Sequence, residues 1–599
     1  MRLHVTLTVV LACHLLSCLP VAGKQLPFAA QTSTSPTSHS IKVAIIGGGA
    51  SGSSAAYWLS KAQEKLDFLG RSSEGVDIHV YERDSVGGRA RVIYPYDDPQ
   101  RYESVELGAS IFADVNRNMV RFAKDFDLPT DAKLDEDGSI TAIWDGQQFV
   151  IEDLSDGWWS STKLFWRYGY SPVTTRSVVN DLKKAFMQLY SPRWMHERKA
   201  ASNETQSGFP WSTIGALSRS LKLDEAAASD AHSWFYGKGV SQLFVEEIIE
   251  AATRVNYGQN TDSIHGLGGG VSLAASGAAG IRGGNYRLFQ ELLVRSNARL
   301  HLAEHGEVTG VVRFANFAEA DAPKWWVGTA AGTGGLYDAV LVATPWHNAG
   351  ITLMNTEAVI PVDKYVHLHV TLLATNASHP KAKYFGRTEG SDVPTSILTT
   401  YEAVRRAGQK RERDGDGGDG EEDEPVSPSR SWRSLLSRNV RQAAAMKSPT
   451  LDFNSLSYLA KLPPRRPSSS QEHLVKIFSP SRLSDEQLDE LFGLERIGWT
   501  YRQEWDAYPE LRPRRSDGED GGDFAAVEPD EGLFYLNAME PLVSTMETST
   551  VSSRNAVALL LSKWYGQEFV VGSRCSWREE ADDDDDAKEG WDGWGCQAA

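Results

Sequence analysis

Residues 42–59, KVAIIGGGASGSSAAYWL, decide the fold of this chain. The apolar run Val43–Ile46 predicts a buried strand, and Ser53–Ala62 predicts the helix that follows a glycine-rich turn. The turn matches G-x-G-x-x-G at Gly47, Gly49 and Gly52, with Ser51 beside the last glycine. Glycines at these places permit a tight bend, a close approach of the backbone to a pyrophosphate, and close helix–strand packing. Strand, turn and helix in this order predict a dinucleotide-binding α/β domain of Rossmann type.

A second predicted strand supports this fold because it ends in an acidic residue. Asp77–Tyr81 has the composition of a β-strand, and Glu82 follows it directly. A carboxylate at this place can accept hydrogen bonds from both ribose hydroxyls of a dinucleotide. Glu82 lies 30 residues beyond Gly52 instead of about 20, which we attribute to a loop around Phe68–Gly75. The alternative is a glycine-rich turn followed by an incidental surface glutamate.

Two further motifs follow the second strand. The sequence ERDSVGGR ends in Gly88 and Arg89, and ELGAS contains Gly108 and Ala109. A glycine pair before an arginine can bring the backbone and a planar guanidinium against a diphosphate, although GGR alone is more often a turn with a surface arginine. In this order the motifs resemble the FAD-binding half of the flavin amine oxidase and phytoene desaturase superfamily. The resemblance implies that Gly88 and Arg89 lie at the pyrophosphate and that Gly108 and Ala109 pass the isoalloxazine ring.

Two later segments resemble the return of the chain to the cofactor domain in that superfamily. Glu307–Val312 is a predicted strand, and the resemblance puts its Val308 near the adenine. Tyr337–Pro345 contains a continuous apolar run typical of a buried parallel strand. For both segments an ordinary core strand is the alternative. The predicted fold class is α/β, with a Rossmann-type FAD-binding domain that is discontinuous in sequence and a second, mixed α/β substrate domain.

A narrower resemblance is to the prenylcysteine oxidases, also called prenylcysteine lyases, which are thioether-cleaving flavoproteins. It rests on RVNYGQN at 254–260, which leads on to Gly283-Gly284-Asn285, on YVHLHVTLLA at 365–374, and on residues 532–565. In such flavoproteins a late segment brings a helix N-terminus to the flavin. The resemblance gives this place to Glu547 and Thr548, ahead of a predicted helix over Asn555–Trp564, whose free N–H groups can face the flavin N1–O2 edge. An ordinary N-cap is the alternative.

The resemblance implies an FAD-dependent thioether oxidase. It would cleave prenyl-L-cysteine with O2 and water to a prenyl aldehyde, cysteine and hydrogen peroxide, in the degradation of prenylated proteins. The sequence contains no second G-x-G-x-x-G in a strand–turn–helix setting, which favours oxygen over NAD(P)H as the electron partner. A flavin amine oxidase acting on another substrate is the first alternative. A flavin-binding, lipid-associated interaction protein without turnover is the second.

The charge of the chain is concentrated in three tracts. The 61 Lys and Arg and 79 Asp and Glu give a net charge of −18, which argues against nucleic acid as a partner. Residues 414–424, 517–523 and 579–586 contain eighteen acidic residues and no basic ones, so they account for the whole net charge. Such runs are typical of solvated loops and tails, with a calcium- or partner-binding role as the alternative.

The N-terminus predicts entry into the secretory pathway. Arg2 precedes a short, mostly apolar run, Leu3–Leu19, and small residues follow, which is typical of a cleaved signal peptide over residues 1–23. No later segment is apolar enough to span a membrane, but peripheral lipid association stays open. The expected destination is the lysosome or vacuole, or the extracellular space. Two sequons and a possible disulfide are consistent with it: Asn203, Asn376, and Cys575 with Cys596.

The expected domain order alternates between the two halves. After a polar lead-in at 24–40, FAD-binding segments are expected at 41–115, 281–350 and 531–574. Substrate-domain segments are expected at 116–280 and 351–511, the second with a disordered insertion at 403–448. An acidic loop at 512–530 and an acidic tail at 575–599 complete the chain. A prenyl tunnel is expected from apolar residues of the middle segment, although such residues are more often core: Trp158, Trp159, Phe165, Trp166, Phe186, Met187, Trp194, Trp234, Phe235, Leu243 and Phe244.

The catalytic residues are not identifiable from the sequence. Hydride abstraction from carbon does not require a general base, and Glu540 and Glu547 are the guesses for one. His367 and His369 lie on one face of a predicted strand and could bind a metal. Two histidines without further ligands are more often a half-exposed strand face, so we expect no metal.

Overall fold

The computed structural model describes residues 40–132, 141–152, 165–191, 194, 208–275, 277–314, 324–406, 451–466, 470–518 and 521–570. The predicted signal peptide, the sequon at Asn203, Cys575 and Cys596, and most of the insertion at 403–448 lie outside these residues. No helix within the described part of the chain combines the length and the apolar character that crossing a bilayer requires.

A five-stranded sheet forms the first half of the molecule. Its strands are β20 (Leu533–Tyr535), β13 (Ala339–Val342), β1 (Ile41–Ile46), β2 (Val76–Glu82) and β9 (Arg299–Leu302), in that spatial order. All neighbouring pairs are parallel. Apolar side chains fill both faces of the central strands, as expected for a parallel sheet covered on both sides. The predicted Rossmann-type domain is therefore confirmed, including its assembly from segments far apart in the sequence.

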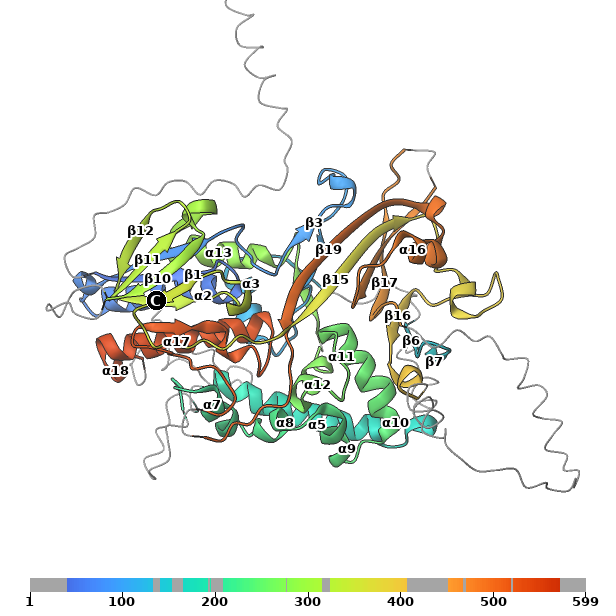
Figure 1. Cartoon of the computed structure of the whole chain (residues 1–599), viewed down its shortest axis with the longest axis horizontal. Coiled ribbons are helices and arrows are strands. Elements are labelled where there is room, and N and C mark those ends of the chain that lie inside the picture. Colours follow the sequence, from blue (N-terminus) through green and yellow to red (C-terminus); the bar gives the residue numbers. More distant parts are fainter. Residues whose placement is uncertain are drawn as a thin grey trace, which may run out of the picture.

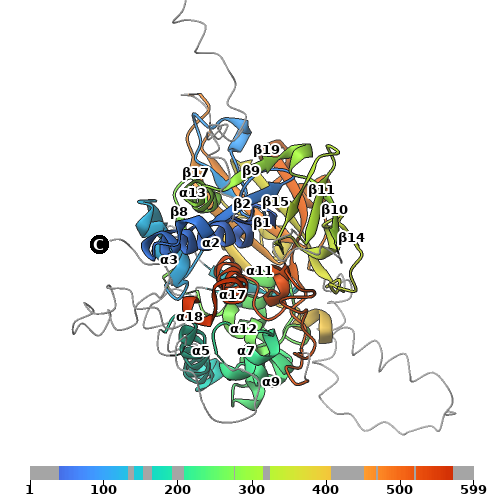
Figure 2. The same ribbon diagram turned by 90° about the vertical axis from the view of Figure 1, so that its left-hand side faces the viewer.

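Helices cover this sheet. The helix after the glycine-rich turn, α2 (Ala50–Phe68), contacts both α13 (Tyr286–Ser296) and α17 (Met546–Tyr565), and α17 also contacts α3 (Arg117–Asp125). Figures 1 and 2 show α17 between the parallel sheet and a lower layer of helices. Its side chains are buried along most of its length because both layers pack against it. The helix begins nine residues earlier than the predicted Asn555, so Glu547 and Thr548 lie within its first turn.

A smaller sheet extends this half, with strand order β12 (Gly334–Tyr337), β11 (Trp325–Thr329), β10 (Val308–Arg313) and β14 (Thr352–Met354). The pairs β12–β11 and β11–β10 are antiparallel, and β10–β14 is parallel. Two short ribbons complete the connections: β3 (Val92–Ile93) with β4 (Val105–Glu106), and β5 (Thr130–Ala132) with β8 (Ala279–Ile281).

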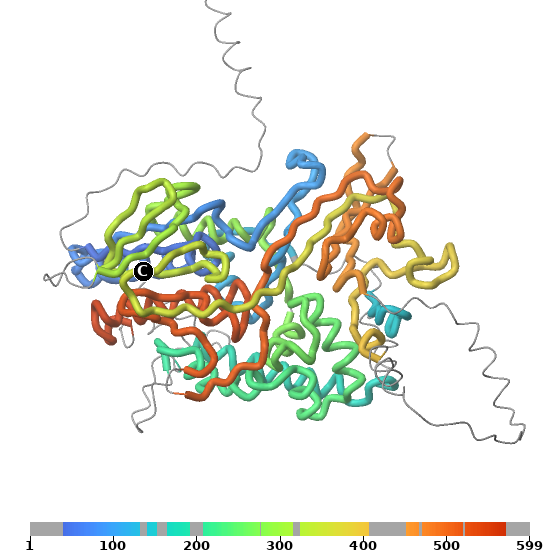
Figure 3. Tube along the Cα trace, in the orientation of Figure 1, coloured from blue at the N-terminus to red at the C-terminus, as the bar shows by residue number. Residues whose placement is uncertain are grey.

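A seven-stranded sheet forms the second half. Two long antiparallel strands, β15 (Tyr365–Thr375) and β19 (Ile497–Pro509), lie at one edge and run from this sheet toward the Rossmann half (Figure 3). Beside β15 follow β18 (Glu472–Ser479), β17 (Ser455–Leu462), β16 (Ser396–Thr399), β6 (Thr141–Trp144) and β7 (Phe149–Glu152). One face of the sheet packs on α16 (Asp485–Phe492) through a separate apolar cluster.

The lower layer is helical. It comprises α5 (Ser171–Met187), α7 (Ile214–Ser220), α8 (Asp224–Ala228), α9 (Ala231–Gly237), α10 (Gln242–Phe244), a π-helical turn η4 (Val245–Ile249), α11 (Glu250–Tyr257) and α12 (Gly266–Ser272). Its buried residues belong to the same apolar cluster as the Rossmann half, and α18 (Gln567–Val570) closes that cluster. The Rossmann half and the helical layer therefore share one core, whereas the large sheet has apolar clusters of its own.

Two predicted loops are more ordered than their composition indicated. Within 512–530, residues 512–518 and 521–530 are described, and Phe524, Ala525 and Val527 are buried. These apolar side chains anchor the segment, while the described acidic residues of the tract, Asp517 and Asp523, are exposed. Likewise Ala403–Arg406 form a helical turn, so the ordered chain extends past the predicted start of the insertion at 403.

Candidate functional site

The glycine-rich turn has the backbone geometry that its sequence requires. Gly47 has φ +113°, and a Cβ there would lie 2.8 Å from the carbonyl oxygen of Ala343. A Cβ on Gly52 would lie 1.8 Å from the carbonyl oxygen of Gly47. Neither position can hold a side chain, so the turn can close only with glycine. Ser51, at the start of α2, accepts a hydrogen bond at its carbonyl from the Ser553 hydroxyl at 2.7 Å, which ties α2 to α17.

Glu82 faces this turn from the end of β2. Its carboxylate accepts hydrogen bonds from the Gly48 N–H and the Asp84 N–H, both at 2.8 Å. Burial raises the pKa of Glu82 above its ordinary value. The structure therefore places the carboxylate beside the turn, where a ribose would lie if the turn holds a pyrophosphate.

The GGR motif lies directly against the same turn. Gly87 donates its N–H to the carbonyl of Gly48 at 3.0 Å, and a Cβ on Gly49 would lie 3.5 Å from the Cα of Gly88. Two loops thus meet through glycine backbones, with no side chain between them. Arg89 extends away from this contact, forms an ion pair with Glu540, and donates to the carbonyl of Ala507 at 2.9 Å.

The predicted flavin-passing segment is held in an unusual conformation. Ala109 has φ +50°, and its carbonyl accepts a hydrogen bond from the buried Asn285 side chain at 2.7 Å. Asn285 also donates its backbone N–H to Glu106 at 2.6 Å. A Cβ on Gly108 would lie 2.5 Å from the indole of Trp505. Asn285 belongs to the GGN sequence, which therefore fixes the shape of residues 106–109.

Val308 begins β10 and is buried. Two residues earlier, Gly306 packs so closely on β2 that a Cβ would lie 2.2 Å from the carbonyl of Glu82. The structure thus brings the start of β10 to the carboxyl end of β2. Its predicted place near an adenine stays a prediction.

The first turn of α17 is capped by its own residues. Thr545 is the N-cap: its hydroxyl accepts from the Thr548 N–H, and the Thr548 hydroxyl accepts from the Thr545 N–H, both at 3.0 Å. The Thr548 side chain is therefore used in the cap. The first N–H groups of the helix still lack intrahelical partners and are the groups that could face a flavin edge.

Glu547 has a structural position. Its carboxylate accepts from the N–H groups of Asn118 and Met119, both at 2.9 Å, and from the Tyr190 hydroxyl at 2.5 Å. Asn118 and Met119 lie in the first turn of α3, so Glu547 supplies the acceptor that this helix end lacks. Its carboxylate points to α3, and this position does not support its choice as a catalytic base.

Glu540 lies at the cofactor side instead. Besides Arg89, its carboxylate accepts from the Tyr365 hydroxyl at 2.6 Å, and burial raises the pKa of that hydroxyl strongly. His265 supports the adjoining Pro541, whose carbonyl lies 3.2 Å from Nε2, while Nδ1 accepts from the Gly268 N–H. Sequence reasoning missed Tyr365 and His265. Tyr365 opens the YVHLHV stretch, but no motif marked its hydroxyl.

The RVNYGQN stretch joins the helical layer to the large sheet. Arg254 donates to Thr399 at 3.0 Å, to Asn260 at 2.7 Å and to Asn454 at 2.9 Å. Burial lowers the pKa of Arg254 to about 10. Gln259 accepts from the Leu511 N–H at 3.0 Å. This stretch is therefore a structural junction.

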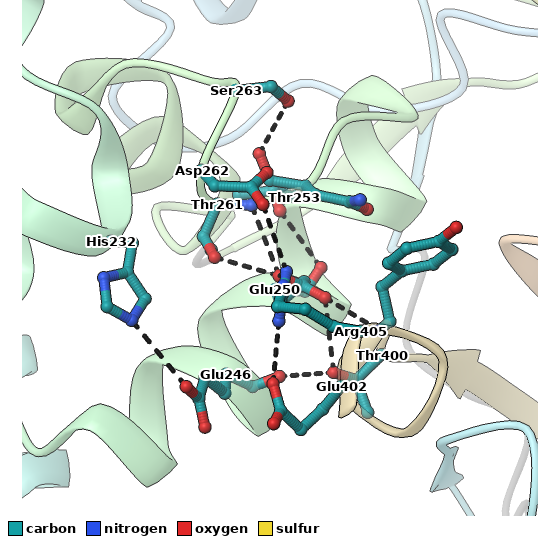
Figure 4. A network of polar contacts seen from close by, with 12 residues as sticks. His232, Glu246, Glu250, Thr253, Thr261, Asp262, Ser263, Thr400, Glu402 and Arg405 are labelled. Carbon is teal, nitrogen blue, oxygen red and sulfur yellow. Dashed lines mark hydrogen bonds and ion pairs between the residues drawn. The ribbon is translucent and has the colours of Figure 1, made fainter. Parts of the chain in front are cut away.

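A second polar network lies beside that junction (Figure 4). Glu250 is completely buried, and its carboxylate accepts from Arg405 at 2.8 Å, from the Thr261 hydroxyl at 2.9 Å and from the Tyr401 N–H at 2.7 Å. Arg405 also pairs with Glu402 at 2.7 Å. Because its charge is matched, the network anchors the chain just before the insertion.

The apolar residues predicted to line a tunnel divide into core and surface. Trp158 and Trp159 lie outside the described residues. Trp234, Phe235 and Phe244 are buried in the shared core, and Phe186, Met187, Trp194 and Leu243 pack partly buried against it. Phe165 and Trp166 are exposed. None of these positions identifies a prenyl tunnel.

The residues at the turn fit a dinucleotide. The glycine backbones of two loops form a cradle that any side chain would fill, and Glu82 closes one side. Among the described residues, Trp505 Nε1 and Asn537 Oδ1 are buried polar atoms without a partner, beside Gly108 and in the turn before Glu540 respectively. The fold and this site define an FAD-binding oxidoreductase of Rossmann type.

The comparison with family models identifies the group to which the chain belongs. The model described as "Prenylcysteine lyase" matches residues 151–407 and 433–572, and "NAD(P)-binding Rossmann-like domain" matches residues 45–126. The chain therefore belongs to the prenylcysteine lyase family, as the sequence predicted.

Curated relatives agree over nearly the whole chain. The chain is 28% identical to farnesylcysteine lyase of Arabidopsis thaliana, over 89% of this chain and 90% of the relative. It is 26% identical to prenylcysteine oxidase 1 of Bos taurus and of Homo sapiens, with 90% and 88% of this chain and 92% and 90% of the relatives covered.

Among solved structures, the chain is similar to cyclohexylamine oxidase from Brevibacterium oxydans, at 11% identity and a TM-score of 0.48 over 88% of this chain and 99% of the other. It is also similar to putrescine oxidase, at 11% identity and a TM-score of 0.46 over 87% of this chain and 99% of the other.

Proposed function

We propose that the protein is an FAD-dependent prenylcysteine oxidase. It cleaves the thioether of farnesylcysteine or geranylgeranylcysteine with O2 and water, and releases a prenyl aldehyde, free cysteine and hydrogen peroxide. The observation that carries the proposal is the family match across residues 151–407 and 433–572, in a chain whose N-terminal glycine cradle fits a dinucleotide. An amine oxidase or a flavin-binding protein without turnover is not favoured, because relatives that match 89% and 90% of the chain are named for prenylcysteine chemistry.

The residues of the chain have distinct tasks in this proposal. Gly47, Gly49 and the first turn of α2 hold the pyrophosphate, because backbone N–H groups and the helix dipole favour its charge. Glu82 accepts from the ribose hydroxyls. Arg89 is held by Glu540 on the loop that meets the cradle.

Bound FAD supplies a two-electron acceptor for the hydride on the allylic carbon next to sulfur, and O2 takes up these electrons. The protein has to orient that carbon and admit one water. After the hydride has left, water adds to the positively charged carbon and loses one proton. The C–S bond of the resulting hemithioacetal then breaks as its hydroxyl proton passes to sulfur, which leaves the aldehyde and the cysteine thiol. No described carboxylate needs to act as a base in the first step.

A peroxide assay tests this function. Purified protein is supplied with farnesylcysteine, geranylgeranylcysteine, putrescine or cyclohexylamine, and hydrogen peroxide and aldehyde are measured. We expect both products, in equal amounts, from the prenylcysteines alone. Turnover of the amines without turnover of either prenylcysteine would contradict the proposal, and protein that carries flavin but oxidises none of them would support the non-enzyme alternative.

We also propose that the protein acts in the secretory pathway, in the lysosome or vacuole or outside the cell. The apolar N-terminal run and the two sequons support this location. Asn376 is half-buried, and its side-chain oxygen accepts from Arg496 at 3.0 Å. Treatment of the expressed protein with an endoglycosidase should lower its apparent mass, and Asn203→Gln and Asn376→Gln should each remove part of that change. An unglycosylated protein that keeps residues 1–23 would contradict the location.

Peripheral association with lipid is a further part of the proposal. Phe165, Trp166 and Tyr170, just before α5, and Val173, in its first turn, are exposed, and Trp166 is 84% exposed. Aromatic side chains of this kind favour a membrane interface. We expect the protein to sediment with phosphatidylcholine and phosphatidylserine vesicles, and Trp166→Ser to weaken this binding. Tyr236→Ser, at another exposed aromatic, is the matched control, and equal effects of both changes would contradict a specific surface.

A further inference from the structure

The edge of the large sheet brings together the two histidines that the sequence left without further ligands. His367 and His369 are two residues apart on β15, so their side chains lie on the same face. The antiparallel register pairs His367 with Asp506 and His369 with Glu504 on β19. A carboxylate therefore faces each histidine across the strand pair.

Three of these side chains converge on one point. One ligand atom each of His367, His369 and Glu504 lie within 4.8 Å of one another. The side chains of His367 and Glu504 are 54% and 62% exposed and that of His369 is 15% exposed, so the point is open to solvent. His369 Nδ1 and Glu504 are 3.5 Å apart, a distance that allows a cation to enter with small side-chain rotations.

Asp506 orients the first histidine. Its carboxylate lies 2.9 Å from His367 Nδ1 and 2.8 Å from His347 Nε2, so it is held between two rings. When His367 Nδ1–H donates to this carboxylate, Nε2 carries the lone pair and can bind a metal. A carboxylate on the second nitrogen is the arrangement found behind most metal-binding histidines.

The surrounding charges permit a cation. Arg482 and Arg502 line the hollow beside His369 and Glu504. The charge of Arg502 is matched by Asp485, at 2.5 Å. The two carboxylates of Glu504 and Asp506 outweigh the remaining charge of Arg482.

We propose that His367, His369 and Glu504 form a binding site for a divalent first-row transition ion of the Zn2+ class, with Asp506 orienting His367. Imidazole and carboxylate are ligands that such ions accept, and two histidines with one carboxylate leave a fourth position for water. The hard ions Ca2+ and Mg2+ prefer all-oxygen sites and should not compete. The site does not depend on the proposed oxidase function.

Isothermal titration of the full chain with ZnCl2, after treatment with EDTA, tests the site. We expect one Zn2+ bound per chain with a Kd that is unchanged by millimolar Ca2+. The variants His367→Ala, His369→Ala and Glu504→Gln should each weaken this binding at least ten-fold. Arg482→Gln should strengthen it, because it removes a positive charge that lines the same hollow as His369 and Glu504.

His232→Ala is the matched control. His232 also lies near a carboxylate, Glu246 at 3.8 Å, but it belongs to no group of three potential metal ligands among the described residues. Its removal should leave the Kd unchanged. Titration with Co2+ should give the visible absorption bands of a nitrogen- and oxygen-bound ion in the wild type and in His232→Ala, and lose them in His367→Ala.

Weak binding by the acidic tracts alone would appear equally in all variants and would overturn the proposal. No Zn2+ binding to the wild type would overturn it as well. The thermal midpoints of His367→Ala and Glu504→Gln in EDTA should equal that of the wild type, because these two side chains are more than half exposed. A ligand variant that unfolds is replaced by His367→Gln or His369→Gln in the same titration.

Discussion

The short segment 540–547 has a nearly buried glutamate at each end, and the two carboxylates have different partners. Glu540 and Glu547 are 4% and 1% exposed and lie seven residues apart. Glu540 pairs with Arg89 and Tyr365 beside the glycine cradle, and Glu547 binds the first turn of α3. Both residues are glutamates with nearly buried side chains, but the groups that bind their carboxylates differ. Arg89 and the Tyr365 hydroxyl bind Glu540, whereas backbone N–H groups make Glu547 part of the framework.

The largest effect, a loss of folding stability, is expected for the replacement of Glu547. Glu547→Ala leaves the N–H groups of Asn118 and Met119 and the Tyr190 hydroxyl without this acceptor in a buried place. We expect a loss of about 4 kcal/mol of stability, seen as a lower thermal midpoint. The exposed Glu568→Ala should change stability by less than about 0.5 kcal/mol. A Glu547→Ala protein that is fully stable but inactive would reverse the assignment of the two glutamates.

His265, which contacts the carbonyl of Pro541 next to Glu540, should make the stability of the protein depend on pH. Burial lowers the pKa of His265 to about 4 from 6.5. Between these values the unfolded chain binds a proton that the folded protein does not, so stability falls as pH falls from 6.5 to 4, by about 3 kcal/mol in total. His265→Gln should remove this slope in a series of unfolding measurements across that range. An unchanged slope would show that other groups cause the acid sensitivity.

Replacement of Glu540 should weaken FAD binding more than it lowers folding stability. Glu540→Gln keeps the shape of the side chain but removes the charge that holds Arg89. We expect a loss of about 2 kcal/mol in FAD binding, or roughly 30-fold in Kd, in reconstitution of the apoprotein. Arg89→Lys should have a similar effect because lysine lacks the planar fork. If both variants keep the full FAD affinity, the pyrophosphate does not bind near Arg89 and Glu540.

The smallest effect is expected at Tyr365. Tyr365→Phe removes one hydroxyl that donates to Glu540 at 2.6 Å and retains the ring, which contacts His347. We expect a loss of about 1 kcal/mol, or about five-fold in FAD affinity. Because the ring remains, the thermal midpoint of the apoprotein should not move. A larger effect than that of Glu540→Gln would mean that the hydroxyl acts on the substrate.

The sequence predicts the backbone part of the site well and its side-chain partners poorly. Gly47, Gly52 and Gly88 were identifiable because only glycine allows their geometry, and Glu82 because it ends a strand. The α/β fold followed from the same motifs. Tyr365 and Asp506 could not be found, because their partners are distant in sequence. The sequence pattern predicts a helix in this region, but it shows neither that α17 begins at Met546 nor that the Glu547 side chain points to α3.

Composition predicts the charge of one segment but not the buried residues that anchor it. Residues 517–523 are acidic, and the loop around them was expected to be solvated. Phe524 and Val527, directly after the tract, are buried, and Arg514 pairs with Asp363. A charged run can therefore cover ordered chain when a few apolar residues next to it reach the core.

Anaerobic titration of the purified protein with farnesylcysteine tests the central claim most directly. The account predicts a flavin absorption band in the isolated protein, its bleaching by one equivalent of farnesylcysteine, and its return when oxygen is admitted, with release of hydrogen peroxide. Protein without a flavin band after reconstitution with FAD, or a flavin band that farnesylcysteine leaves unchanged, would contradict it.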